Sequence, residues 1–232
     1  MKSIILIVPY FGKWPIWFEA YLVSIKKNNT INWLFITDCE IPANKPINAQ
    51  FKSITLKDFN DSVNKELNLN ILLSARKICD LRIAFAQIFR REILDYDFWG
   101  YCDVDIIWGD IRKFITNEKL QNFEIISSRK ENTSGHFTVF KNINKVNSFY
   151  CKIPNYNNLL EHPLLQRLDE DVFIRELKRQ GGLKISWNIT LLNHDKQQRA
   201  HQEYYLDRWK WKDGKMIDTY QNKEVMYLHF IN

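Results

Sequence analysis

The first forty residues of the chain alternate between two patterns of apolar positions. Ser3–Val8 is almost wholly apolar and rich in β-branched side chains, which predicts a fully buried strand. Apolar side chains recur at helical spacing over Ile16–Lys27, and Trp33–Thr37 is a second buried run that leads into Asp38. A strand, a helix and a strand in this order predict a parallel pair joined by a right-handed crossover.

Later segments continue this alternation. We expect helices at Asp58–Leu67, at Ser74–Leu94 (a stretch that could break near Cys79-Asp80) and at Asp169–Gln180, where Gly181-Gly182 would end the helix. We expect strands at Phe98–Cys102, Phe123–Ser127, Phe137–Phe140 and Val225–Phe230, and a hairpin over Tyr204–Asp218 that turns at Asp213-Gly214. With no repeat and no linker, residues 1–232 are predicted to be a single α/β domain with a mostly parallel central sheet flanked by helices.

Composition places the chain among ordinary globular proteins. Of its 232 residues, 45% are hydrophobic and 26% charged. The first apolar run covers only Ile4–Val8 before Pro9, too short for a signal peptide or a membrane span, so we expect a cytoplasmic protein. The four cysteines are scattered and predicted to be free. Gly-rich phosphate loops of the Walker and dinucleotide types are absent.

The net charge is +6. A solvated basic surface explains it, and attraction to an anionic substrate or to the inner face of the cell membrane is the alternative. No nucleic-acid-binding motif accompanies the charge, so we expect no nucleic-acid partner.

The main candidate for a functional motif is Asp103-Val104-Asp105, which directly follows the apolar run that ends at Cys102. Carboxylates at the end of a buried strand are costly unless a positive charge compensates them. Residues i and i+2 of an extended segment point to the same side, so both carboxylates can face one Mg²⁺ or Mn²⁺ ion with a phosphate beyond it. An acidic surface turn is the alternative explanation.

Two other strand ends carry polar side chains. Tyr10 follows the first predicted strand, and Asp38 follows the second. In open α/β sheets, ligands bind outside the carboxyl ends of the strands. Tyr10 could therefore stack on a nucleotide base and Asp38 could hydrogen-bond it, although both residue types also suit turns.

Several ordered motifs together resemble GT-A glycosyltransferases, and more narrowly short bacterial enzymes of capsule or lipopolysaccharide synthesis. They are Lys77–Phe85, Phe98–Asp105, Gly109–Ile111, Gly135–Phe137, Asp169–Asp171 and Tyr227–Phe230. The resemblance implies a nucleotide diphosphate sugar donor, UDP-linked, and transfer to a hydroxyl of a glycan or lipid-linked glycan. It implies a nucleotide-sugar-binding half over residues 1–110 and an acceptor-binding half over residues 111–232.

The resemblance also assigns roles. It implies that Asp105 binds the metal directly, that Asp103 contributes to metal or ribose, and that His229 is a further ligand. Asp171, with Glu170 as the alternative, would deprotonate the acceptor if the reaction inverts configuration; if it retains configuration, these carboxylates would hold the donor sugar. The further candidates are Pro9, Tyr10, Asp38, Lys77, Asp80, Arg82 and Val104 for the nucleotide, and Gly135, His136, Asp169 and Trp108 for the sugars.

Structural explanations stand beside these roles. Asp169–Asp171 would cap the helix that they begin. Lys77, Asp80 and Arg82 would form a solvent face of the separate helix expected at Ser74–Leu94. His229 could be a satisfied, partly buried histidine. His194-Asp195 and His201–Glu203 are expected in loops near the acceptor. Two other function classes stay open: a nucleotidyltransferase or phosphate-ester enzyme with the same metal pair, and a non-catalytic glycan-binding module.

Overall fold

In the computed structural model, residues 1–129, 132–187 and 206–229 are described. The strands are β1 (Ile4–Pro9), β2 (Asn32–Thr37), β3 (Ala49–Ser53), β4 (Phe98–Cys102), β5 (Ile106–Trp108), β6 (Ile125–Ser127), β7 (Phe137–Lys141), β8 (Ile185–Trp187), β9 (Trp209–Lys212), β10 (Lys215–Asp218), β11 (Lys223–Val225) and β12 (Tyr227–His229). The α-helices are α1 (Phe18–Lys26), α2 (Leu56–Leu67), α3 (Phe85–Ile88), α4 (Ile111–Phe114), α5 (Asn117–Asn122), α6 (Asn144–Asn147), α7 (Tyr156–Glu161) and α8 (Phe173–Gln180). Three 3₁₀ helices, η1 (Lys77–Ala84), η2 (Phe149–Lys152) and η6 (Leu206–Arg208), and one π-helix, η3 (Leu168–Val172), complete the described elements.

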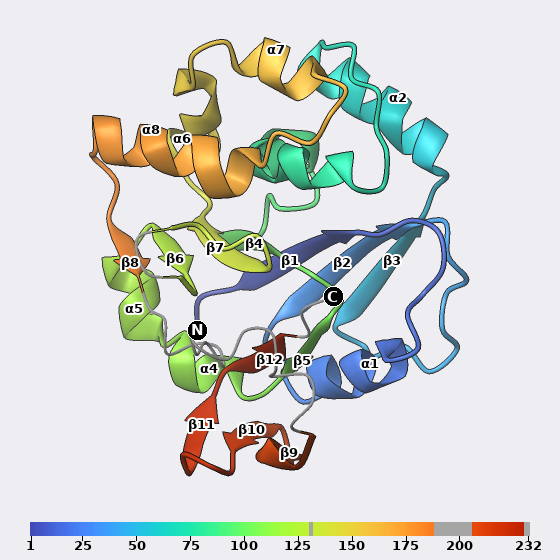
Figure 1. The fold of residues 1–232 in the computed structure, drawn as a ribbon, viewed down its shortest axis with the longest axis vertical. Coiled ribbons are helices and arrows are strands. Elements are labelled where there is room, and N and C mark those ends of the chain that lie inside the picture. The colour runs from blue at the N-terminus through green and yellow to red at the C-terminus, as the bar shows by residue number, and fades with distance from the viewer. Residues whose placement is uncertain (130–131, 188–205, 230–232) are drawn as a thin grey trace.

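A seven-stranded sheet in the order β3-β2-β1-β4-β7-β6-β8 forms the centre of the described structure (Figure 1). The strands β3, β2, β1 and β4 are mutually parallel, β7 is antiparallel to β4 and β6, and β6 is parallel to β8. The predicted α/β class and mostly parallel sheet are therefore confirmed. The predicted crossover pairs β1 with β2 through α1.

Two hydrophobic cores cover the two faces of this sheet. Alternate residues of β1 point to opposite faces, so Ile5 and Ile7 join one core while Ile4 and Leu6 join the other. The first core packs under α2, η1, α3 and α8, and the second packs against α1, α4, α5 and the β5–β12 pair. No helix in the described part of the chain has the length and apolarity that crossing a bilayer requires.

The predicted helix at Ser74–Leu94 is wrong in type. The segment forms η1 and the single turn α3 instead. Six of the eight residues of η1 are buried, so it lacks the solvent face that the amphipathic pattern implied. Side chains three residues apart eclipse in a 3₁₀ helix, and this brings Lys77 over Asp80 in a buried ion pair at 2.8 Å.

Two other expectations need correction. The helix expected at Asp169–Gln180 begins as the π-helix η3 and continues as α8, which ends before Gly181. The strand expected at Val225–Phe230 divides, because β11 pairs with β10 whereas β12 pairs with β5; Phe230 lies outside the described residues. The hairpin is present as β9 and β10 around Asp213-Gly214, both with positive φ, and residues 204–205 lie outside the description.

Candidate metal centre and pocket

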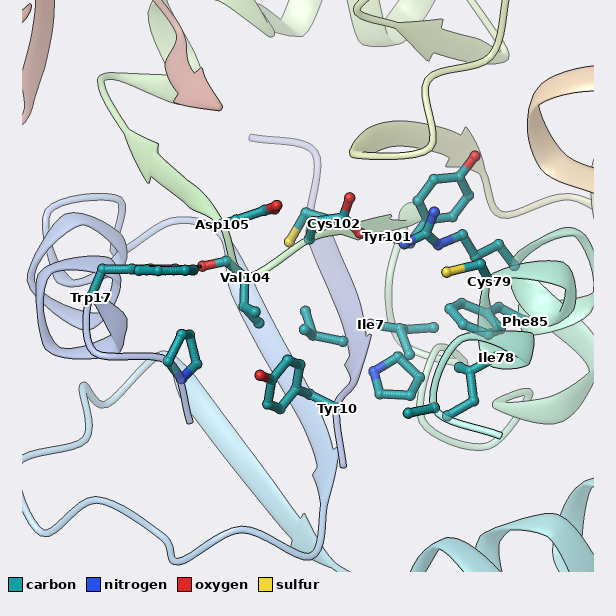
Figure 2. A pocket seen from close by; sticks show the side chains of 16 residues that line it. Ile7, Tyr10, Trp17, Ile78, Cys79, Phe85, Tyr101, Cys102, Val104 and Asp105 are labelled. Atoms are coloured by element: carbon teal, nitrogen blue, oxygen red, sulfur yellow. Dashed lines mark hydrogen bonds and ion pairs between the residues drawn. The ribbon is translucent and has the colours of Figure 1, made fainter. Parts of the chain in front are cut away.

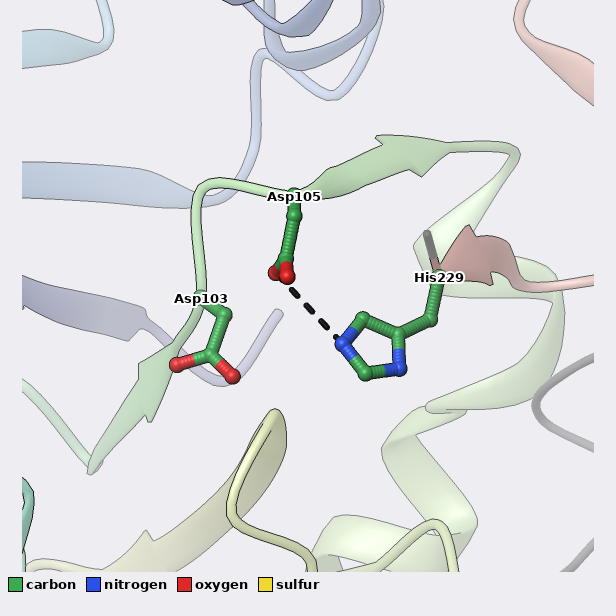
Figure 3. A group of neighbouring side chains, drawn as sticks. All are labelled: Asp103, Asp105 and His229. Carbon is green, nitrogen blue, oxygen red and sulfur yellow. Dashed lines mark ion pairs between the residues drawn. The ribbon is translucent and has the colours of Figure 1, made fainter. Parts of the chain in front are cut away.

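The connection between β4 and β5 carries the acidic pair. β4 ends at Cys102, and β5 begins at Ile106. β12 runs antiparallel to β5 with His229 opposite Ile106, and this pairing brings the end of β12 to the acidic turn. Ligand atoms of Asp103, Asp105 and His229 all lie within 4.8 Å of one another, and their side chains surround a common space (Figure 3).

The polar atoms of this group could serve as ligands of a cation. Oδ1 of Asp105 lies 3.4 Å from Nε2 of His229, and it is buried without a hydrogen bond from any residue that the structure describes. Burial raises the pKa of Asp103 above its ordinary value, and the charge of Asp105 adds to this rise while Arg82 opposes it. An unsatisfied buried oxygen beside a second carboxylate is a cost that a divalent cation would remove.

A pocket of about 310 Å³ is lined in part by Asp103 and Asp105. It lies at the carboxyl ends of β1 and β4, where the sequence predicted a ligand site. Trp17 and Asp105 lie at one end of it, Ile78 and Phe85 at the other, and Tyr10 on a side wall (Figure 2). Pro9, Val104 and Arg82 also line it, as predicted for a nucleotide site.

Two aromatic side chains shape the pocket. The Tyr10 ring stacks on Trp14 with ring centroids 5.1 Å apart, and its hydroxyl donates to Lys13 O at 3.0 Å. Trp17, which the sequence analysis did not single out, donates its indole N–H to Val104 O at 3.1 Å and so ties the acidic turn to the start of α1. Asp38 does not line the pocket; its carboxylate accepts the Gly12 N–H at 2.7 Å and holds the loop that carries Tyr10.

Arg82 joins the acidic turn to η3. Its guanidinium forms ion pairs with Asp103 and, at 3.1 Å, with Asp169. Burial raises the pKa of Asp169 to about 6, even though Arg82 acts against the rise. The two acidic motifs therefore lie on either side of one arginine.

Glu170 is held by several donors. Arg129 donates to it at 2.9 Å, Arg167 at 2.7 Å and the Gly135 N–H at 3.2 Å. Burial acts to raise the pKa of Glu170, but these donors outweigh burial and the pKa is lowered. A Cβ on Gly135 would lie 2.9 Å from the Glu170 carboxylate, so glycine permits this close approach.

Asp171 differs from its two neighbours. Its side chain is 53% exposed and lies 3.6 Å from the Arg167 guanidinium. It does not line the pocket, and neither does Glu170. The structure thus brings Asp169 toward the metal centre through Arg82, and turns Asp171 toward solvent.

Four residues that the sequence analysis expected to contact a ligand are buried. Trp108 packs among Trp33, Phe137 and Tyr227 in the core. The Lys77 ammonium is enclosed by Asp80 and by the carbonyls of Leu159 and Leu164. Asp80 also accepts the N–H groups of Gln166 and Leu168. His136 is only 3% exposed.

Sequence reasoning also missed the residues behind His229. Tyr227 donates its hydroxyl hydrogen to Ser128 Oγ at 2.6 Å, and Ser128 Oγ lies 3.3 Å from Nε2 of His136. One signal was present, since Tyr227 precedes His229 by two positions and shares its side of a strand. Nothing in the sequence pointed to Arg129 or Ser128. The histidines at 194 and 201 lie outside the described residues.

Solved structures show what this fold resembles. GlyE of Streptococcus pneumoniae, named as a glycosyltransferase, matches at 12% identity with a TM-score of 0.52, over 100% of this chain and 55% of that chain. Mouse xyloside xylosyltransferase 1 matches at 12% identity with a TM-score of 0.49, over 99% and 97% of the two chains. The galactosyltransferase LgtC matches at 11% identity with a TM-score of 0.48, over 98% and 87%. The likeness to GlyE shows a GT-A-like fold.

Sequence comparison gives a family but no activity. No curated protein matches the chain. The profile of one family, described as a family of unknown function (DUF6625), matches residues 6–232, and this chain therefore belongs to that family.

Proposed function

We propose that the protein is a metal-dependent glycosyltransferase. It moves a sugar from a nucleotide diphosphate sugar, UDP-linked, to a hydroxyl of a bacterial surface glycan. The observation that carries the proposal is the convergence of Asp103, Asp105 and His229 within 4.8 Å, beside the pocket at the carboxyl edge of the sheet. The GT-A-like fold shared with a protein named as a glycosyltransferase supports the class.

The donor atoms of the proposed centre suit Mn²⁺ better than Mg²⁺. Mg²⁺ prefers oxygen ligands, whereas this group mixes two carboxylates with one imidazole. Asp105 and His229 would hold the ion, and Asp103, already paired with Arg82, would complete the group. A bound ion would supply Lewis-acid stabilisation for the departing nucleoside diphosphate.

The chain's own residues would bind and orient the donor. The Tyr10 ring lines the pocket and is stacked on one face by Trp14, and its other face would receive a planar base. Trp17 fixes the carbonyl of Val104 and hence the turn between the two carboxylates. Arg82 lines the pocket and would lie beside the diphosphate, where a guanidinium neutralises developing negative charge.

The acidic cluster in η3 suits a holding role. Two guanidinium groups and a backbone N–H already occupy the Glu170 carboxylate, and its lowered pKa makes it a weak base. Asp171 is the remaining candidate base of the two, and its outward position is against that role. We therefore assign Glu170 to positioning Arg129 and Gly135, and Asp169 to positioning Arg82.

The two halves of the chain divide the work. Residues 1–110 contain the pocket lining and the acidic pair, and residues 111–232 contribute His229 and would supply the acceptor side. The acceptor would be a glycan or a lipid-linked glycan, and contact of the basic surface with the inner membrane face would accompany the second.

A thermal-shift screen with UDP-, GDP-, CMP- and dTDP-sugars, each with and without Mn²⁺, tests the proposal. Ligand at 100 times its Kd stabilises by about 2.7 kcal/mol, which for a chain of this size raises Tm by about 5–10 °C. We expect this shift for a UDP-sugar with Mn²⁺. The Asp105→Asn variant should lose it, and the exposed control Asp95→Asn should keep it.

Two results would contradict the proposal. If a nucleotide sugar raises Tm by the same amount with Mn²⁺ and with a chelator, donor binding does not depend on a metal. Hydrolysis or exchange at the phosphate with no sugar transfer to any acceptor would instead identify a nucleotidyltransferase or phosphate-ester enzyme.

A further inference from the structure

His136 contacts two of the three residues of the proposed metal centre. Its backbone carbonyl accepts the N–H of Asp103 at 3.2 Å. Its ring lies against the imidazole of His229, with ring centroids 4.3 Å apart and planes inclined by 30°. With only 3% of its surface exposed, the residue has no face open to a substrate. It is therefore placed to act on the metal centre from behind.

The other side of His136 is fixed by a buried hydrogen-bonded pair. Ser128 Oγ lies 3.3 Å from Nε2 of His136 and accepts the Tyr227 O–H at 2.6 Å. Ser128 and Tyr227 are both 0% exposed, so water does not compete for these groups. The ring of His136 consequently has a defined position before any ligand arrives.

Tyr227 and His229 belong to the same short strand. They lie two positions apart on β12, so their side chains project from the same side. Both contact His136, since the Tyr227 ring meets it edge-on with ring centroids 5.7 Å apart. Over its described length β12 pairs with β5 through three residues. The position of His229 therefore depends on its contact with His136 as well as on the short β12–β5 pairing.

We propose that His136 is a positioning residue for the metal centre. It holds the imidazole of His229 by ring contact and the main chain of Asp103 by a hydrogen bond, while Ser128 and Tyr227 hold it in turn. The inference rests on the proposed metal-dependent function, because it needs a metal at this site. Ligands restrained in advance bind a metal more tightly, and loss of an outer-shell partner weakens affinity about 10–100-fold.

Direct Mn²⁺ titration followed by electron paramagnetic resonance tests the role without relying on activity. We expect His136→Ala to weaken Mn²⁺ binding about 10–100-fold. His136→Phe should recover most of this loss, because it keeps an aromatic face against His229. Tyr227→Phe, which removes only the hydroxyl, should show an intermediate loss. Tyr150→Phe is the matched control, since its buried hydroxyl bonds to Gln87 away from the metal centre.

The melting temperature of each variant separates positioning from stability. A merely structural role predicts a lower Tm with an unchanged Kd for Mn²⁺ in the folded fraction, and that result would overturn the inference. If His136→Ala does not fold, Tyr227→Phe decides: binding equal to that of Tyr150→Phe would overturn it. Wild-type protein that binds no Mn²⁺ would overturn the proposed function as well, whereas tight wild-type binding with unchanged variants would overturn this inference alone.

Discussion

Nε2 of His229 lies 3.4 Å from Oδ1 of Asp105, although the two residues come from opposite halves of the chain. The pairing of β12 with β5 brings the two segments together, since it places His229 opposite Ile106, the residue that follows Asp105. The acidic turn that follows β4 and the last described strand therefore complete one site (Figure 3).

Arg82 should not tolerate replacement by lysine. Its planar guanidinium contacts Asp103 and Asp169 at once, and a single ammonium cannot reproduce both contacts. We expect Arg82→Lys to lower the free energy of unfolding by about 1.5–3 kcal/mol, because lysine keeps the charge but loses one of the two charge-assisted contacts. Urea unfolding measures this change.

The double variant Arg82→Lys/Asp169→Asn refines this prediction. It removes the carboxylate that Arg82→Lys leaves unpaired, so part of the lost stability should return. Arg90→Lys serves as control, because the pair of Arg90 with Glu66 at 3.2 Å is 62% exposed on the arginine side and exposed pairs contribute little. If Arg82→Lys and wild type had equal free energies of unfolding, the proposed role of Arg82 in bridging Asp103 and Asp169 would be contradicted.

Asp80 should matter to the fold rather than to the donor. Its carboxylate accepts hydrogen bonds from Lys77 Nζ at 2.8 Å, from Gln166 N at 2.8 Å and from Leu168 N at 3.0 Å. We expect Asp80→Asn to lower the free energy of unfolding by about 3–5 kcal/mol, since it leaves a buried ammonium without its counter-charge. In the fraction that remains folded, the Kd for a UDP-sugar should be unchanged.

Calorimetric titration at low temperature separates these two effects of Asp80→Asn. Glu92→Gln is a suitable control, because it breaks the partly exposed Lys52–Glu92 pair. If Asp80→Asn bound the donor tenfold more weakly but had unchanged stability, Asp80 would belong to the nucleotide site.

The pair Arg208–Asp218 should make stability depend on pH. Burial acts to raise the pKa of Asp218, but two hydrogen bonds from Arg208, at 3.0 and 2.6 Å, outweigh burial and the pKa is lowered. A lowered carboxyl pKa contributes stability above the ordinary value of 3.8, and this contribution is lost as the pH falls below it. The difference in free energy of unfolding between wild type and Asp218→Asn should therefore be full above about pH 5 and shrink below about pH 4. Urea unfolding at several pH values measures it, and a difference that grows toward low pH would show the opposite sign.

The elements that the sequence predicted best are those with a strong local pattern. β1, β2 and β4 are short apolar runs buried on both faces. α2 begins at Leu56, two residues before the predicted Asp58, because Thr55 caps it. β3, β5 and β8 were not anticipated, because they are short and depend on neighbouring strands for their definition. The division of the last strand likewise depends on two different partners, β10 and β5.

In the candidate site too, the sequence predicted what depends on local pattern and missed what depends on tertiary packing. Asp103, Asp105 and His229 were anticipated, and the structure brings them together. Trp108 and His136 were expected to contact sugars because aromatic and imidazole groups suit that role, yet tertiary packing buries both. Lys77 and Asp80 were placed by the pattern of an α-helix, and the 3₁₀ geometry turned them toward each other instead. Burial of a polar side chain is a property of the whole fold, so local spacing could not reveal it.

The most direct test of the account is a metal titration of donor turnover. After chelation, wild-type protein should release nucleoside diphosphate from a UDP-sugar only when Mn²⁺ is restored. Asp105→Asn should lose more than about 100-fold of this activity, beyond the effect of an outer-shell change. The surface variant Asp95→Asn should match wild type at every Mn²⁺ concentration. Full Mn²⁺-dependent turnover by Asp105→Asn would contradict the metal centre, and with it the function proposed for this chain.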